Sequence, residues 1–286
     1  MTRPVRLIAI DLDGTLLNSK VELSRENRDA LQRAHAEGVE IVLGTGRRHD
    51  FAMPIAKSLG FDLWLFSSNG AVTRSTLGET FHRDLLPKTT ALKFAAAMQH
   101  YRNYMVLTFD RPGMGAIVCE NHDQLYGVIQ RWMEKNAPFI KYVSPIEKAL
   151  TEDPIQAMIC GPVALMDQAQ QELADLEFWQ DFTALRTQYD YRDLCIVDIL
   201  NAGCSKGHAL ERWAIHRSLQ RDEVMAIGDN YNDVEMLTFA GHPVIMGNAC
   251  DELKQNGWTV TLPHDEHGVA ATIEQVLESN AAILDA

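Results

Sequence analysis

Two aspartates stand one residue apart near the amino terminus, in the pattern Asp-x-Asp-Gly-Thr at residues 11–15. The pattern directly follows the apolar stretch 5–10, which is expected to form a buried strand. Because residues i and i+2 of an extended segment point to one side, the carboxylates of Asp11 and Asp13 can share a cavity. Hard oxygens suit Mg2+, and Gly14 allows the backbone to turn tightly. The extended pattern indicates phosphoryl transfer, whereas a lone Asp-x-Asp would favour a solvated acidic loop.

A second polar segment, Gly-Thr-Gly-Arg, ends the apolar stretch 39–43. Its glycines permit close approach of the backbone to an anion, and Thr45 offers a hydroxyl donor beside Gly46. Arg47 has two interpretations: it pairs with a phosphate, or it braces the loop against Asp50 or another carboxylate. Glycine and threonine often serve turn geometry alone, so this segment gains weight only beside the others.

A lysine, Lys206, stands where a helix is expected to begin. Its compact positive charge can neutralise both Asp11 and an incoming phosphate. Most lysines are solvated surface groups, and that alternative applies to Lys206 as well. Its position relative to the other segments is what favours a role in the site.

The fourth segment, Gly-Asp-Asn-Tyr-Asn-Asp at residues 228–233, follows another apolar strand. Asp229 and Asp233 add oxygen ligands for a metal, and the Asn232 amide can donate to a phosphate. Helix capping by Asp229 or Asn232 is the simpler alternative, but capping alone does not explain the whole hexad.

The elements that carry these segments alternate between strand and helix, as a parallel sheet with crossover helices requires. Polar segments that follow parallel strands meet at one edge of the sheet, where such folds bind ligands. A hairpin is expected at 71–83. The expected strands cover 5–10, 39–43, 63–66, 224–227 and 244–246. The expected helices cover 24–35, 50–59, 207–217, 233–240, 249–256 and 268–277, the last followed by a tail that frays.

The rhythm changes between residues 86 and 199, which predicts an inserted α+β domain with an antiparallel sheet. The remaining parts, 1–85 and 200–286, form the α/β domain, a Rossmann-like parallel sheet with helices on both faces. Within the insert, helices are expected at 90–100, 123–135 and 163–176, and strands at 104–110, 115–120, 155–160, 182–188 and 195–200.

Composition restricts the partners of this chain of 286 residues. With 39 acidic and 26 basic side chains its formal charge is −13, which opposes general affinity for nucleic acid or an anionic membrane. The five cysteines lack Cys-x-x-Cys spacing, and no signal peptide or membrane-spanning stretch is found. Free thiols in the cytoplasm are therefore expected.

Together the four segments resemble those of the haloacid dehalogenase superfamily, in its Cof-like subfamily of type IIB with a large inserted cap. The resemblance covers essentially the whole length and is strongest at residues 11–15 and 228–233. It implies that 1–85 and 200–286 form the catalytic core, and that the cap, 86–199, closes over the site and selects the leaving group. Arg111, His122, Lys141 and Arg186 are cap candidates, each with a surface role as the simpler alternative.

The resemblance also implies roles for the site residues. Asp11 is the nucleophile that forms an aspartyl phosphate, and Asp13 protonates the leaving alkoxide and then activates water. Mg2+ is held by Asp11, the main-chain carbonyl of Asp13 and Asp229, with Asp233 supporting the acidic cluster. The phosphate is bound by the Leu12 amide, Thr45, Gly46, Lys206 and Asn232.

The resemblance therefore implies a Mg2+-dependent phosphatase for a small phosphorylated metabolite, such as a sugar phosphate or pyridoxal phosphate, acting as a monomer or small homo-oligomer. Alternatives are a phosphomutase of the phosphomannomutase type and a non-catalytic phosphate-binding module. The acid at Asp13, where transport ATPases of the superfamily have threonine, favours turnover. Asn69 matches a strand-end pattern of the family, either as site wall or as a substrate contact. His267 departs from the acidic pair that relatives commonly carry there.

Overall fold

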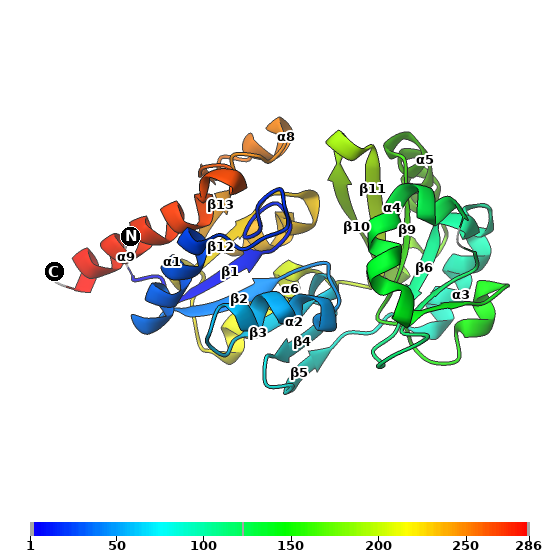
Figure 1. Ribbon diagram of the computed structural model, residues 1–286, viewed down its shortest axis with the longest axis horizontal. Coiled ribbons are helices and arrows are strands. Elements are labelled where there is room, and N and C mark those ends of the chain that lie inside the picture. The colour runs from blue at the N-terminus through cyan, green and yellow to red at the C-terminus, as the bar shows by residue number, and fades with distance from the viewer. Residues whose placement is uncertain (1–2, 122, 285–286) are drawn as a thin grey trace. The chain divides into compact units, whose positions relative to one another are not determined.

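The computed structural model describes residues 3–121 and 123–284 and divides the chain into two compact units (Figure 1). The first unit comprises the residues up to 83 together with those from 205 onward. The second unit comprises residues 84–204, which the chain inserts between the two halves of the first.

The first unit is built on an eight-stranded sheet. Its strands are β1 (Leu7–Asp11), β2 (Glu40–Gly44), β3 (Trp64–Ser67), β4 (Val72–Ser75), β5 (Thr80–Arg83), β12 (Val224–Gly228), β13 (His242–Ile245) and β14 (Thr259–Val260). They lie in the order β14-β13-β12-β1-β2-β3-β4-β5, with parallel pairing from β14 to β3 and an antiparallel hairpin, β4–β5, at the edge. The central strand β1 thus has β2 and β12 as its neighbours.

Helices cover both faces of this sheet. One face packs against α1 (Arg25–Ala36), α2 (His49–Ser58) and α9 (Gly268–Leu284), and the other against α6 (Lys206–His216), α7 (Val234–Phe239) and α8 (Asp251–Lys254). Ile8 and Ile10 of β1 belong to the core cluster that includes α1, α2 and α9. Leu7 and Ala9 belong to the cluster that includes α6, α7 and α8. Because adjacent strand residues point to opposite faces, an apolar strand such as β1 needs a helical layer on each side. The predicted α/β class is confirmed.

The carboxyl-terminal helix differs from the prediction that it would end near residue 277 and then fray. Helix α9 continues to Leu284, and its buried residues extend to Asn280. The Asn280 side chain accepts from the Val5 backbone nitrogen and donates to the Val5 carbonyl, each at 2.8 Å. Among the described residues, no helix combines the length and apolarity needed to cross a membrane.

The second unit has the α+β architecture predicted for the insert. Its strands are β6 (Met105–Thr108), β7 (Ile117–Cys119), β8 (Ile140–Tyr142), β9 (Gln156–Gly161), β10 (Phe182–Tyr189) and β11 (Leu194–Asn201), and its helices are α3 (Lys88–Ala97), α4 (Asp123–Asn136) and α5 (Val163–Ala174). The sheet order is β10-β11-β9-β6-β7-β8, antiparallel except between β7 and β8. The short strand β8 was not predicted. Side chains of α3, α5 and alternate strand residues form the core of this unit.

Candidate active site

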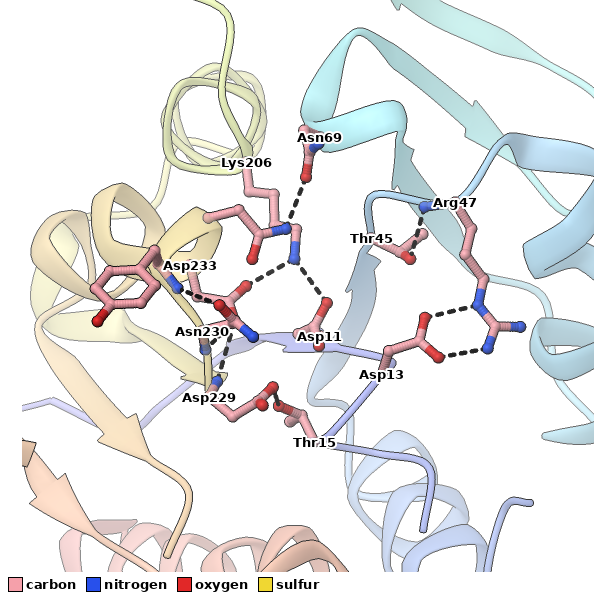
Figure 2. Close-up of polar contacts among 12 residues, drawn as sticks. Asp11, Asp13, Thr15, Thr45, Arg47, Asn69, Lys206, Asp229, Asn230 and Asp233 are labelled. Carbon is pink, nitrogen blue, oxygen red and sulfur yellow. Dashed lines mark hydrogen bonds and ion pairs between the residues drawn. The ribbon is translucent and has the colours of Figure 1, made fainter. Parts of the chain in front are cut away.

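The polar segments predicted from the sequence meet at one edge of the first unit's sheet (Figure 2). Asp11 ends β1, Thr45 follows β2, Asp229 follows β12, and Lys206 opens α6. Since β1 pairs in parallel with β2 and β12, the loops after these three strands leave the sheet side by side.

Three buried carboxylates form the centre of the site. Ligand oxygens of Asp11, Asp229 and Asp233 lie within 4.8 Å of one another. The turn after β1 wraps closely around Asp229, because Thr15 Oγ1 donates to Asp229 Oδ1 at 2.9 Å. A Cβ at position 14 would lie only 2.3 Å from Asp229 Oδ2, and the backbone there has a φ of +88°. Glycine is therefore required at this point of the turn.

Lys206 is a buried ion-pair partner inside this cluster. Its Nζ donates to Asp11 Oδ1 at 2.6 Å and to Asp233 Oδ1 at 2.7 Å, and the side chain has no exposed surface. The aliphatic stem passes over Gly44, where a Cβ would lie 3.7 Å from Lys206 Cδ. The surface alternative for this lysine is therefore excluded by its burial.

The buried charges shift one another's titration. Burial raises the pKa of Asp11 to about 7, Lys206 opposes this shift, and Asp233 and Asp13 add to it. Burial and the neighbouring Asp11 also raise the pKa of Asp229 well above its ordinary range. For Lys206, burial lowers the pKa, but the two carboxylates outweigh burial and hold the pKa above its usual value. Three carboxylates against one ammonium leave the cluster short of positive charge.

The donor set fits a small divalent cation such as Mg2+, which prefers carboxylate oxygens. Asp233 Oδ2 already accepts from the backbone nitrogens of Asp229 and Asn230, at 3.0 and 3.1 Å, and its other oxygen accepts from Lys206. Asp11 and Asp229 each keep one oxygen outside these hydrogen bonds. Asp233 is thus an anchor of the loop, and Asp11 and Asp229 are better suited as ligands.

The Asp13 carboxylate lies apart from the cluster and pairs with Arg47. Arg47 Nε contacts Asp13 Oδ2 at 2.7 Å, and Arg47 Nη2 contacts Asp13 Oδ1 at 2.5 Å. The two side chains are 25% and 33% exposed. The carboxylate that Arg47 braces against is therefore Asp13, whereas Asp50 pairs with Arg48 at 3.6 Å. The sequence had left this partner open.

The predicted phosphate donors line the same edge. Thr45 Oγ1 accepts from the Arg47 backbone nitrogen at 3.1 Å, so its own O–H remains available for an anion. The Leu12 side chain belongs to the core, which leaves only its backbone for the site. Asn232 Nδ2 donates to Asn69 Oδ1 at 2.9 Å, and both side chains are buried. Gly46 lies beside this pair, since a Cβ there would be 3.4 Å from Asn69 Oδ1.

Several contacts of the site have no signal in the sequence. Thr15 was part of the pattern after β1 but had no assigned partner, and it holds Asp229. Asn248, which was not singled out, donates to the Gly14 carbonyl at 2.9 Å. These contacts join segments more than 200 residues apart, and no local pattern predicts them.

Other candidates lie outside the cluster. His267 has a left-handed backbone, with a φ of 60°, and its Nε2 lies 3.7 Å from Glu26 Oε2. In the second unit, Arg111 donates to the Gly115 carbonyl and Arg186 pairs with a carboxylate. Lys141 is exposed. His122 lies outside the described residues.

Comparison with known proteins gives one consistent family. A sequence model of the haloacid dehalogenase-like hydrolases matches residues 8–273. The phosphatase YwpJ of Bacillus subtilis is 31% identical over 96% of this chain and 100% of its own length. The pyridoxal phosphate phosphatase YbhA of Escherichia coli is 29% identical over 87% of this chain and 90% of its own. The crystal structure of a haloacid dehalogenase-like hydrolase from B. subtilis has a TM-score of 0.79 at 28% identity, covering 94% of this chain and 99% of that one.

Proposed function

The chain belongs to the haloacid dehalogenase-like hydrolases, in their Cof-like subfamily, and is a phosphoric monoester hydrolase; we propose that it is Mg2+-dependent and acts through an aspartyl phosphate. The observation that carries this proposal is the buried cluster in which Lys206 holds one oxygen of Asp11, and ligand oxygens of Asp11, Asp229 and Asp233 lie within 4.8 Å of one another. An oriented carboxylate beside a site that can hold a cation is what nucleophilic attack on phosphorus needs.

Asp11 and Asp229 are the proposed metal ligands from side chains, with the main-chain carbonyl of Asp13 as a third. The bound Mg2+ would offset the negative charge of the phosphoryl group and of Asp11. Asp233 is proposed to support the site indirectly. It holds the loop that carries Asp229, and it fixes the position of the Lys206 ammonium group.

In the first proposed step, an oxygen of Asp11 forms a bond to phosphorus while the bond from phosphorus to the leaving oxygen breaks. Asp13 gives its proton to that oxygen, so the product leaves as an alcohol. In the second step, Asp13 takes a proton from water, and the water oxygen attacks phosphorus and releases Asp11 with inorganic phosphate. The pair with Arg47 positions the Asp13 carboxylate, and proton transfer requires one of its two oxygens to leave Arg47, which the partial exposure of both side chains permits.

The proposed phosphate donors spread the charge of the transferring group over fixed positions. Such preorganised donors supply the largest part of catalysis in phosphoryl transfer. Lys206 is already fixed by two carboxylates, and Asn232 by Asn69. The donors are the Leu12 amide, Thr45, Gly46, Lys206 and Asn232.

The substrate is proposed to be a small phosphorylated metabolite. The similarity to a pyridoxal phosphate phosphatase supports this class. The second unit, residues 84–204, is proposed to be the cap that selects the leaving group. The cytoplasm is the proposed compartment, because the structure records no disulfide among the described cysteines.

The test is phosphate release from a panel of phosphorylated metabolites, including sugar phosphates and pyridoxal phosphate, with Mg2+. We expect release of inorganic phosphate that stops with excess EDTA and returns when Mg2+ is added in excess. Full activity in EDTA would contradict the metal assignment. Isomerisation of a sugar phosphate without phosphate release would indicate a mutase, and binding of phosphate without turnover would indicate a binding module.

A further inference from the structure

The turn Ser68–Gly70, at the end of β3, contacts three of the four segments that carry proposed phosphate donors. The Asn69 backbone nitrogen donates to the Thr45 carbonyl at 2.9 Å, and the Asn69 side chain accepts from Asn232 at 2.9 Å. Figure 2 shows Asn69 above the cluster, with this second hydrogen bond dashed. A Cβ at Gly70 would lie 2.4 Å from the Ser205 carbonyl oxygen, next to Lys206. One short turn thus holds three separate loops together.

The turn keeps an uncommon backbone. Ser68, Asn69 and Gly70 have consecutive left-handed φ values of 49°, 53° and 93°. Left-handed backbone is costly for serine and is tolerated best by glycine and asparagine. In the described part of the chain, the buried Ser68 hydroxyl also has no hydrogen-bond partner. Such features persist where the surrounding contacts fix the conformation, and they cluster at functional sites.

Asn69 determines what the Asn232 carboxamide can offer. A carboxamide has two N–H donors and one oxygen, and rotation by half a turn exchanges them. With one N–H held by Asn69 Oδ1, rotation would place the Asn232 oxygen against the Asn69 oxygen, which is repulsive. The bond therefore keeps the nitrogen in place and leaves its second N–H for a phosphate oxygen.

We propose that Asn69 is a positioning residue, which orients the Asn232 carboxamide toward the phosphate through the hydrogen bond between them. The inference rests on the proposed phosphate site. Asn69 does not need to touch the substrate in this account, because its effect passes through Asn232.

The first test is Asn69→Gly, which removes the acceptor but suits the left-handed backbone. We expect kcat/KM to fall by about tenfold or more, and the inhibition constant of inorganic phosphate to rise, because a misplaced donor loses stabilisation of the anion. Asn280→Ala is the matched control, since it also removes hydrogen bonds of a buried asparagine, at the far end of β1. It should lower the melting temperature without changing either constant.

The second test is a double-mutant cycle with Asn232→Ala, because residues that act through one bond are not additive. In the Asn232→Ala background, we expect Asn69→Gly to reduce kcat/KM by less than about threefold. A loss equal to that in the wild type would overturn the inference, as would unchanged kinetics in Asn69→Gly. An inactive wild-type protein would instead refute the proposed function.

A crystal structure of the wild-type protein with Mg2+ and inorganic phosphate tests the same point without a substitution. We expect Asn232 Nδ2 within hydrogen-bond distance of both the phosphate and Asn69 Oδ1. An Asn232 that binds the phosphate after leaving Asn69 would overturn the inference, even if Asn69→Gly fails to fold.

Discussion

Asp11 and Asp13 leave the same strand end but lie in different surroundings. Asp11 is buried with Lys206, Asp229 and Asp233, whereas Asp13 is one-third exposed and has Arg47 as its partner. A nucleophile benefits from a fixed position and a dry site, while a group that exchanges protons needs room to move and access to water. The difference in packing therefore separates the two proposed roles more clearly than their sequence spacing does.

The largest expected effect comes from Asp11→Asn, which removes the proposed nucleophile. We expect kcat to fall by about 10⁴-fold or more, because an amide oxygen does not replace the carboxylate. The fold should persist, since the substitution keeps the shape and removes a buried charge. Phosphate release and the circular dichroism spectrum check the two parts, and activity like that of the wild type would refute the assignment.

Asp13→Asn should slow turnover by about 10²- to 10⁴-fold, the usual contribution of general acid–base catalysis. Its effect on the free energy of unfolding should stay below about 1 kcal/mol, because the ion pair with Arg47 is partly exposed. Steady-state kinetics and chemical denaturation measure both quantities. A large loss of stability would contradict the contrast with the buried cluster.

Lys206→Met should reduce activity by about 10²- to 10³-fold, as loss of a fixed donor to a charged transition state does. It should also destabilise the protein by roughly 3–5 kcal/mol, because Asp11 and Asp233 would then be buried without their partner.

Lys254→Met is the matched control for that substitution. Lys254 pairs with a largely exposed Asp251, so the change should cost less than about 0.5 kcal/mol. Equal losses for the two lysine variants in chemical denaturation would show that burial does not distinguish them.

The smallest effect on activity is expected for Arg47→Lys, which keeps the charge but not the two-pronged contact with Asp13. Since such a pair contributes at most about 1 kcal/mol, activity should fall by no more than about fivefold. The loss should appear in kcat and disappear in the Asp13→Asn background. A loss of the same size in that background would show that Arg47 acts elsewhere.

The sequence predicted the strands and helices of the site because three of the four polar segments directly follow an apolar stretch and the fourth opens a helix. That placement alone brings Asp11, Thr45 and Asp229 to one edge of the sheet. The burial of Lys206 and the pair between Asp13 and Arg47 were not predictable in this way. They depend on side-chain conformations and on loops that meet only in the folded chain.

Two errors in the fold have similar causes. The tail expected to fray is helical because Asn280 bonds with Val5, a partner 275 positions away. Strand β8 pairs in parallel with β7 at the edge of its sheet. Its three residues are too few to show an alternation of apolar and polar side chains in the sequence. Local patterns thus predict elements, while long-range contacts set where they end.

The most direct test of the central claim uses Asp13→Asn, in which the intermediate should break down slowly. The protein is mixed with a substrate that the wild type hydrolyses, quenched in acid, digested and analysed by mass spectrometry. We predict that the mass of one phosphoryl group is added to Asp11 and is absent from Asp11→Asn treated in the same way. A phosphoryl group on another residue, or none at any time during turnover, would contradict the account.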